Sequence, residues 1–248
     1  MSEGAVVGGR RAVVEAIRAG RVREVLVANG VRGTQGMQAV RAAAVSAGVD
    51  VHEIDRDQLD RMAQGHQGVV ARLRDADVHP TQLGERDLGR FPYADDALVV
   101  VLDGITDPQN LGAAARTAEG AGASVLVTRV RRAADVTPAA IRASSGALLH
   151  MPHARVANIP RALGRLQDAG FTVVGLDGDA ERSIFDEQCP VGRLAIVIGS
   201  EGEGMSRLVR ERCDVVVRLP MHGRVDSLNA SASLAAALYG FVLPSRTT

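Results

Sequence analysis

The chain has 248 residues with 29 basic and 29 acidic side chains, so its formal net charge is zero. That balance argues against a strong nonspecific polyanion binder, and an aromatic content of 2% leaves few rings for stacking bases. The two cysteines, Cys189 and Cys213, have neither metal-like nor redox-like spacing and fit a reducing cytoplasm. No apolar run approaches the length of a membrane span and no signal peptide is recognised, so no membrane partner is expected.

Residues 1–75 are predicted to form a small α/β unit, because short apolar strands alternate with amphipathic segments. His66-Gln67-Gly68 directly precedes a strand, and a turn explains this trio better than a catalytic role for His66. The elements expected here are helices over 12–19 and 35–47, a helical turn over 59–62, and strands over 22–28, 49–54 and 69–73.

A linker is predicted over residues 76–96. Acidic side chains outnumber arginines there, and two prolines and two glycines punctuate the run. This composition is typical of a segment between domains.

Residues 97–248 are predicted to form an α/β domain with a parallel sheet, because strands and helices alternate. The unbroken apolar strand over 98–102 is typical of a sheet covered on both faces. In such sheets ligands bind at the carboxyl ends of the strands. The further elements expected are strands over 124–128, 171–176, 194–198 and 215–219 and helices over 111–121, 138–147, 159–169, 206–212 and 228–243.

The first of three polar loops at such strand ends runs from Asp103 to Gly112 and leads into a helix that carries Arg116. Arg116 lies one turn beyond Gly112, where the missing side chain leaves room for a ligand. An arginine there can bind a phosphate or a developing oxyanion. A surface ion pair with Glu119, three positions on, explains it equally well.

The second loop, residues 199–205, has the sequence Gly-Ser-Glu-Gly-Glu-Gly-Met. Closely spaced glycines let the backbone wrap a ligand, although a plain flexible turn has the same composition. The loop lacks the spacing of a dinucleotide fingerprint and the lysine of a P-loop. Glu201 and Glu203 would repel a phosphate and suit a cationic or hydroxyl-rich ligand better.

The third loop, residues 219–229, ends with Ser227 and Asn229 at the expected start of the last helix. Such side chains cap the free N–H groups of a helix start, and the same dipolar end can hold a ligand. Taken alone, this loop favours capping.

Other polar clusters are weaker candidates. His150 and His153 are three positions apart, but Pro152 interrupts any helix and no third ligand is evident, so no metal site is expected. The basic run 129–132 is interpreted as a solvated face. Spacing alone assigns no Ser–His–Asp constellation.

Together the three loops resemble the SpoU/TrmH family of RNA ribose 2′-O-methyltransferases, which belongs to the SPOUT superfamily. The matching stretches are residues 107–112 with Arg116, then 198–205, then 219–229. The N-terminal unit is similar to the family's optional ribosomal-protein-like RNA-binding domain. Within the family, the chain most resembles the bacterial members that methylate a guanosine of 23S rRNA.

The resemblance implies a SPOUT catalytic domain with a trefoil knot, an exception to the rarity of knots in proteins. It also implies S-adenosylmethionine as the cofactor, RNA as the substrate, no metal, and a homodimer with the active site at its interface. The positions that match the family's cofactor contacts are Leu176, Asp177, Gly178, Ile198, Gly199, Ser200, Leu219, Met221 and Leu228.

Five positions match the family's catalytic motifs, namely Asn110, Arg116, Glu201, Ser227 and Asn229. The methyl group moves in line from a sulfonium to a ribose oxygen, so alignment is a large part of catalysis. Arginine is normally protonated, so Arg116 is expected to act as a clamp that also stabilises the forming alkoxide, rather than as the base proposed for the family. Ser227 and Asn229 are expected to orient the hydroxyl or the cofactor.

Two alternatives remain open: a tRNA methyltransferase of the same family, and a non-catalytic RNA-binding module that retains the fold. The extra N-terminal unit favours rRNA over tRNA. The five intact catalytic positions favour an enzyme over a binding module.

Overall fold

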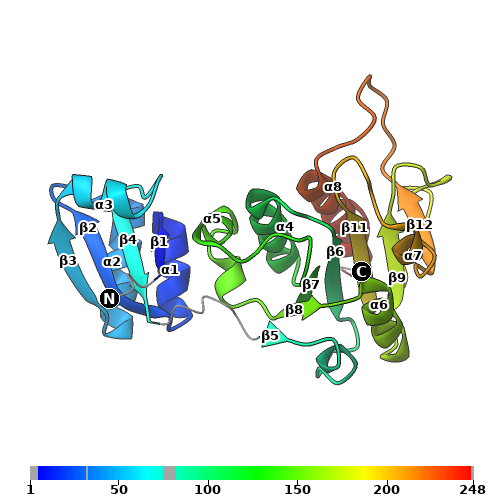
Figure 1. Cartoon of the computed structure of the whole chain (residues 1–248), viewed down its shortest axis with the longest axis horizontal. Helices are drawn as coiled ribbons and strands as arrows, with labels where there is room; N and C mark the ends of the chain where they lie inside the picture. Colours follow the sequence, from blue (N-terminus) through cyan, green and yellow to red (C-terminus); the bar gives the residue numbers. More distant parts are fainter. Residues whose placement is uncertain (1–4, 32, 75–81, 247–248) are drawn as a thin grey trace. The chain divides into compact units, whose positions relative to one another are not determined.

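The computed structural model of the chain describes residues 5–31, 33–74 and 82–246. They form two compact units, each with its own sheet (Figure 1). The first comprises the described residues of Met1–Pro80 together with Val136–His150, and the second comprises those of Thr81–Asp135 and Met151–Thr248. The predicted continuous ranges, 1–75 and 97–248, do not provide for the excursion Val136–His150.

The first unit has a mixed sheet with strand order β1–β4–β2–β3. β2 runs parallel to β3, whereas β4 is antiparallel to both β1 and β2. The elements of the unit are β1 (Val6–Gly8), α1 (Arg10–Arg18), β2 (Val22–Ala28), α2 (Gln35–Ala47), β3 (Asp50–Ile54), α3 (Arg56–Met62), β4 (Val69–Leu73), α5 (Pro138–Ala143) and the 3₁₀ turn η2 (Ala147–Leu149).

His66 is buried in the turn that leads into β4. Its Nδ1 accepts a hydrogen bond from the Gly68 backbone N–H at 3.0 Å, and its Nε2 lies 2.8 Å from Asp60 Oδ1. Both ring nitrogens are therefore engaged in shaping the turn, which agrees with the structural interpretation of this trio.

In the excursion Val136–His150, α5 packs on β1 and η2 packs on α1 of the same unit. Ser145 and Gly146 follow α5 with positive φ angles of 52° and 95°. At Gly146 a Cβ would overlap the side chain of Glu15 in α1, so only glycine allows this close approach. The left-handed conformation of Ser145 and Gly146 also stops the helix, so α5 ends at Ala143 rather than at residue 147 as predicted.

The second unit is built on an eight-stranded sheet with the order β10–β12–β9–β11–β6–β7–β8–β5. Every neighbouring pair is parallel, which confirms the predicted parallel sheet. Its strands are β5 (Gln82–Leu83), β6 (Leu98–Asp103), β7 (Val125–Arg129), β8 (His153–Val156), β9 (Thr172–Leu176), β10 (Arg182–Ser183), β11 (Leu194–Gly199) and β12 (Val215–Arg218). The helices are η1 (Asp87–Gly89), α4 (Pro108–Gly120), α6 (Ile159–Asp168), α7 (Arg207–Arg210), α8 (Ala230–Ala237), the π-helix η3 (Leu238–Val242) and α9 (Leu243–Arg246).

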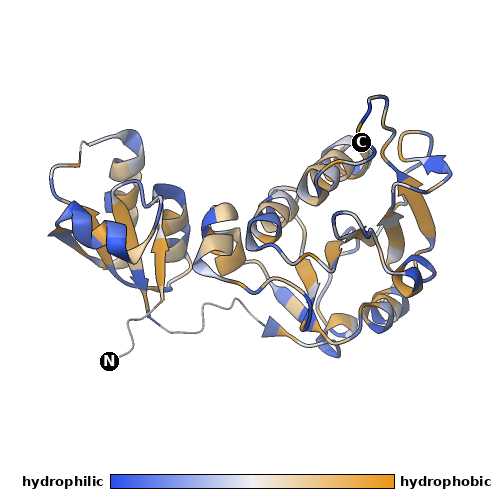
Figure 2. Cartoon of the chain, turned by 45° about the horizontal axis from the view of Figure 1, so that its top comes forward, coloured by the Kyte–Doolittle hydropathy of each residue, from blue (hydrophilic) through white to orange (hydrophobic). Residues whose placement is uncertain are grey.

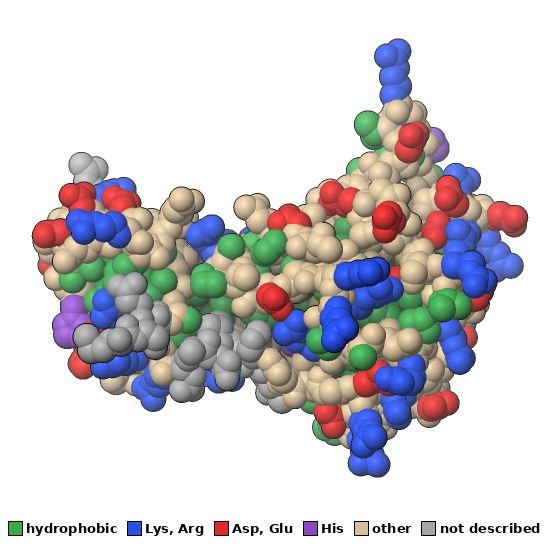
Figure 3. Space-filling model, viewed as in Figure 1, with side chains coloured by type: hydrophobic (Ala, Val, Ile, Leu, Met, Phe, Trp, Pro, Cys, Tyr) green, Lys and Arg blue, Asp and Glu red, His purple; other side chains and the backbone are tan. Residues whose placement is uncertain are grey.

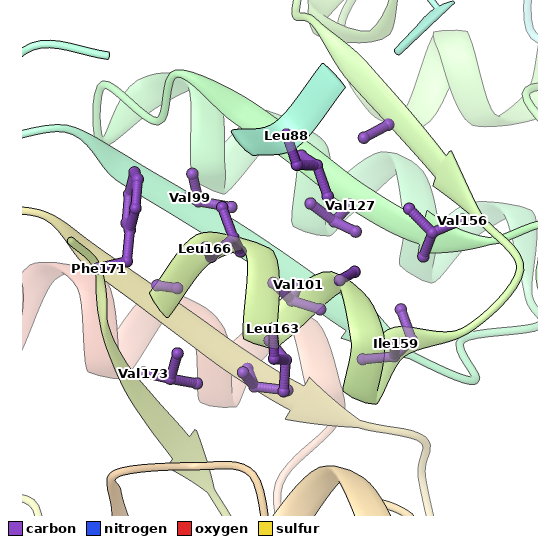
Figure 4. Packing of buried hydrophobic residues seen from close by; sticks show 14 of the residues in the cluster. Leu88, Val99, Val101, Val127, Val156, Ile159, Leu163, Leu166, Phe171 and Val173 are labelled. Atoms are coloured by element: carbon purple, nitrogen blue, oxygen red, sulfur yellow. The ribbon is translucent and has the colours of Figure 1, made fainter. Parts of the chain in front are cut away.

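The core of the second unit lies against this sheet. Val99 and Val101 of β6 face α6, which contributes Ile159, Leu163 and Leu166 to the same buried cluster (Figure 4). The alternate residues of β6 are equally buried and point to the opposite face, where α4 packs against α8. Figure 2 shows the apolar strands enclosed by helices with polar outer faces. The buried central strands therefore hold their carboxyl ends rigidly.

Residues 82–96, part of the predicted linker, are folded onto the second unit. β5 pairs with β8, and Leu88 of η1 is fully buried in the core. The remaining predicted linker residues, 76–81, lie outside the described part of the chain. Within the described residues, no helix combines the length and apolarity that a bilayer span requires.

Candidate active site

Three loops at the carboxyl ends of β9, β11 and β12 enclose a cavity of 380 Å³ in the second unit. The loop after β12 is the extended one that leads into α8 in Figure 1. All nine positions predicted to contact the cofactor line this cavity: Leu176, Asp177, Gly178, Ile198, Gly199, Ser200, Leu219, Met221 and Leu228.

The glycine loop after β11 closes on itself through two backbone hydrogen bonds. The Ser200 N–H donates to the Gly204 carbonyl at 3.1 Å, and the Gly204 N–H donates back at 3.0 Å. At Gly199 a Cβ would overlap the backbone of Gly204, so the turn is too tight for any side chain there. Gly202 and Gly204 have positive φ angles of 84° and 65°. These glycines are therefore required by backbone geometry, and a plain flexible turn does not describe them.

Asn110, Glu201 and Asn229 form a hydrogen-bonded cluster at the mouth of this loop. The side-chain amide of Asn110 donates to Glu201 Oε1 at 2.9 Å. The amide of Asn229 donates to the same oxygen at 2.5 Å and to Asn110 Oδ1 at 2.9 Å. The start of α4, the glycine loop and the cap of α8 are far apart in sequence, and their side chains thus meet around one carboxylate.

Local caps hold the two asparagines in place. Asp107 caps α4, its carboxylate accepting from the backbone N–H groups of Gln109 at 3.1 Å and Asn110 at 3.3 Å. Asn229 is the N-cap of α8 and accepts through Oδ1 from the N–H of Ser231 at 2.9 Å. Because that oxygen faces the helix, the amide nitrogen of Asn229 is directed at Glu201.

The remaining two catalytic candidates are placed differently. Ser227 lines the cavity but lies two residues before the cap of α8. Arg116 is exposed on α4 and is not among the described lining residues. Within the described part of the chain Arg116 makes no hydrogen bond or ion pair, so the alternative pairing with Glu119 does not form.

Asp103 is a buried anchor that the sequence pattern did not single out. Its Oδ2 accepts from the Ser206 N–H at 2.9 Å, and its Oδ1 pairs with the Arg129 guanidinium at 2.5 Å. Arg129 also donates to the Ser206 hydroxyl at 3.3 Å. The end of the glycine loop is thereby tied to the end of β6, and Arg129 belongs to this network rather than to a solvated face. An acid ending an otherwise apolar strand is the sequence signal for it.

The cavity is acidic. Five of its lining residues are acids and one is an arginine, Arg210, which pairs with Asp177 at 3.3 Å. Nearby, burial raises the pKa of the Cys213 thiol to about 12, so this cysteine stays protonated and is a poor nucleophile. No cluster of three potential metal ligands occurs among the described residues. The five acidic residues that line the cavity are Asp177, Asp179, Glu201, Glu203 and Asp226.

The parallel sheet holds the glycine loop and the cavity at the carboxyl ends of its strands, which is where α/β domains bind small ligands. Residues 97–239 match the sequence model of the SpoU rRNA methylase family, and residues 6–78 match that of the RNA 2′-O ribose methyltransferase substrate-binding domain. The chain therefore belongs to the SpoU rRNA methylase family, which confirms the resemblance carried by the three loops.

Individual relatives agree with this assignment. The 23S rRNA (guanosine-2′-O-)-methyltransferase RlmB of Photobacterium profundum is 42% identical over 195 residues, which are 77% of this chain and 78% of the relative. A crystal structure of an RNA 2′-O ribose methyltransferase superposes with a TM-score of 0.81 at 27% identity, covering 98% of this chain and 89% of its own. The SpoU methyltransferase AviRb of Streptomyces viridochromogenes, in complex with the cofactor AdoMet, gives a TM-score of 0.77 at 28% identity, covering 98% and 91%.

Proposed function

We propose that this protein transfers a methyl group from S-adenosylmethionine to a ribose 2′-hydroxyl of RNA, with a guanosine of 23S rRNA as the target. The observation that carries the proposal is the single cavity lined by all nine predicted cofactor positions, with the Asn110–Glu201–Asn229 cluster beside it. The names of the RlmB relative and of the AdoMet complex support the substrate and the cofactor.

The cavity suits S-adenosylmethionine in charge. The cofactor carries a sulfonium, an ammonium and ribose hydroxyls, and the five acidic lining residues can attract the cations and accept from the hydroxyls. The glycine loop offers backbone groups at close range because Gly199 and Gly204 have no side chains. The bound cofactor supplies an activated methyl group.

Residues of this chain would align the ribose and stabilise the charge that forms on it. Glu201 is held in one orientation by the amides of Asn110 and Asn229, so it can accept a hydrogen bond from a ribose hydroxyl at a fixed position. Arg116 has no carboxylate partner within the described residues, and its charge is free to meet a phosphate or the forming alkoxide. Ser227 lines the cavity and would orient the cofactor.

The homodimer and the trefoil knot belong to the same proposal. Arg116 does not line the cavity, which supports an active site completed at an interface between two copies. Tyr239 of the π-helix η3 is 52% exposed, and its ring would offer apolar area to such an interface. Light scattering should give twice the chain mass of 26.0 kDa, and a crystal structure of the cofactor complex would show whether the chain forms the trefoil knot.

We place the enzyme in the cytoplasm, where RNA is its partner.

The decisive experiment measures transfer of labelled methyl from S-adenosylmethionine to separated rRNA and tRNA, followed by nucleoside mapping. The proposal predicts 2′-O-methylguanosine in 23S rRNA. Label in tRNA alone would select the tRNA methyltransferase instead. Label in neither pool, together with intact RNA binding, would leave the non-catalytic RNA-binding module.

A further inference from the structure

The first unit contains a cavity of 460 Å³ that the proposed function does not use. It lies where the start of α1, the start of α2, the turn before β4 and the end of α5 come together. We call it the arginine cavity. Its described lining residues are Gly9, Arg10, Arg11, Ala12, Gly36, Gly65, Gln67, Arg142 and Ser145.

The charge of the arginine cavity is uncompensated by its own lining. Three of the described lining residues are arginines and none is acidic. This contrasts with the whole chain, in which acids and bases balance. Like charges that converge in one cavity repel each other, so a bound anion would stabilise the arrangement.

Two of the three guanidiniums are fixed by neutral partners. Arg10 donates from Nε to the Gln67 carbonyl at 3.2 Å and from Nη1 to the Thr34 hydroxyl at 2.9 Å. Arg142 donates from Nη1 to the Gln64 carbonyl at 2.5 Å. Carbonyl and hydroxyl oxygens orient a guanidinium without neutralising it, so both arginines keep their charge and lose little freedom on binding an anion.

The backbone around the cavity is shaped to make this room. A Cβ at Gly36 would lie 3.0 Å from Cδ of Arg10, so glycine lets that side chain pass. Gln67 and Ser145 both have positive φ angles, 54° and 52°, and both line the cavity. A positive φ costs free energy in residues other than glycine, and such residues cluster at active sites and ligand-binding sites.

We propose that the arginine cavity binds a phosphodiester group of the substrate RNA. Guanidinium groups match phosphate oxygens in geometry and charge. The described lining contains no aromatic ring, so the cavity fits the RNA backbone rather than a stacked base. The inference rests on the proposed function, because it takes RNA as the substrate.

The site is composite in sequence. Gly9 to Gln67 fall within the substrate-binding match at residues 6–78, whereas Arg142 and Ser145 fall within the methylase match at 97–239. RNA contacts would therefore not be confined to the part of the chain whose family model is described as substrate binding.

The test compares RNA binding by the full-length protein and by the double variant Arg11→Gln/Arg142→Gln. Arg11 is exposed and Arg142 half-buried. The probe is a 23S rRNA transcript, and filter binding is measured at several KCl concentrations. Affinity should fall about five- to tenfold near 0.1 M salt, and the slope of log K against log salt should decrease by about 0.7 to 0.9 for each phosphate that the variant no longer neutralises. Affinity for S-adenosylmethionine should not change.

Matched controls separate the cavity from general charge. The variant Arg23→Gln/Arg56→Gln removes two exposed arginines of the same unit that do not line the cavity, and it should bind RNA like the wild type. Arg11→Lys/Arg142→Lys keeps the charges and should retain most of the affinity. If Arg142→Gln lowers the unfolding midpoint, the single variant Arg11→Gln carries the comparison, because Arg11 has no partner within the described residues.

The outcomes separate this inference from the proposed function, because binding is measured without methyl transfer. Equal RNA affinity of the cavity variant and the control variant would overturn the inference, even if the wild type methylates 23S rRNA. Binding of inorganic phosphate can be measured with the same variants. If Arg11→Gln/Arg142→Gln loses affinity for phosphate but keeps its affinity for RNA, the inference is also overturned, since the cavity would then hold only a small free anion. A wild type that binds RNA through these arginines but transfers no methyl group would support the inference and refute the proposed enzyme.

Discussion

At the residue scale, Asn229 serves two structures at once. Its side-chain oxygen caps α8 and its side-chain nitrogen donates to Glu201. A capping residue in a protein of this kind therefore need not be only structural. The two roles use different atoms, so substitutions can separate them.

We expect Asn229→Ser to keep α8 and lose activity. Serine is an equally good N-cap, so stability should change by only a few tenths of a kcal/mol, about the spread among good caps. Its shorter side chain lacks the amide nitrogen that donates to Glu201, and kcat should fall about 100-fold, the effect of losing one positioned hydrogen bond in an active site. Asn229→Ala should show the same loss of kcat and about 1 kcal/mol of lost stability. Thermal unfolding and single-turnover methylation measure both effects. Wild-type kcat in Asn229→Ser would reduce the residue to a cap.

Arg116 should act on methyl transfer and not on cofactor binding. It is exposed on α4 and does not line the cavity. Arg116→Ala should therefore leave the Kd for S-adenosylmethionine unchanged while kcat falls about 100- to 1000-fold, as when a group that stabilises a developing oxyanion is lost. Calorimetry with the cofactor and methylation of 23S rRNA supply the two numbers. Full activity in this variant would remove Arg116 from the mechanism.

Whether a site residue can be recognised from the sequence depends on whether its role follows from a local motif or from contacts with distant residues. The nine positions that the family resemblance predicts for the cofactor all line one cavity, and their role as cofactor contacts stays a prediction. The anchor Asp103 could not be recognised in the same way, because its importance comes from burial beside Arg129 and Ser206, residues distant in sequence. The hydrogen bonds from the amides of Asn110 and Asn229 to Glu201 could not be predicted either, because they depend on how three distant segments fold together.

At the element scale, the glycine loop after β11 is the most tightly constrained segment of the site. A Cβ at Gly199 would overlap Gly204, whereas a Cβ at Gly223 in the loop after β12 would meet nothing within 4 Å. Both glycines have φ angles outside the left-handed region. The two positions are therefore a matched pair for the same substitution.

Gly199→Ala should open the loop and weaken cofactor binding. The methyl group has no space, so the backbone of the loop must shift, which costs about 1–3 kcal/mol in a packed site. At about 2–4 °C per kcal/mol, the unfolding midpoint should drop measurably, and the Kd for S-adenosylmethionine should rise at least about tenfold, which corresponds to 1.4 kcal/mol. Gly223→Ala should change neither quantity. Equal behaviour of the two variants would contradict the packing argument.

Elements were predictable from sequence where periodicity is strong and long. The bounds predicted for β2, α2 and β4 match those observed, and the central strands of the parallel sheet lie where apolar runs predict them. The final helix was predicted over 228–243, but it begins at Ala230 because Asn229 is held as a non-helical cap, and it becomes a π-helix at Leu238. The two-residue strands β5 and β10 carry no periodic signal, since they exist only by pairing with β8 and β12.

At the scale of the whole molecule, a net charge of zero conceals local separation of charge. Acids gather around the cavity of the second unit, and arginines gather in the arginine cavity of the first. On the face seen in Figure 3, blue and red side chains are interspersed, so neither concentration is evident as one broad patch there. A net charge of zero argues against a strong nonspecific polyanion binder. It does not say where on the molecule an anionic or a cationic ligand could bind.

The cofactor should stabilise one unit and leave the other unchanged. The described residues that line its cavity all belong to the second unit. At a concentration 100 times its Kd, a ligand raises the free energy of unfolding of the structure that binds it by about 2.7 kcal/mol. Amide hydrogen exchange that requires this structure to open then slows about 100-fold. With S-adenosylmethionine, amides in β9, β11 and the glycine loop should therefore exchange more slowly, while those of β2 and β4 in the first unit should keep their rates. Hydrogen exchange followed by mass spectrometry resolves these peptides. An equal slowing in β2 and β4 would mean that the two units open as one cooperative structure, and that binding in the second is transmitted to the sheet of the first.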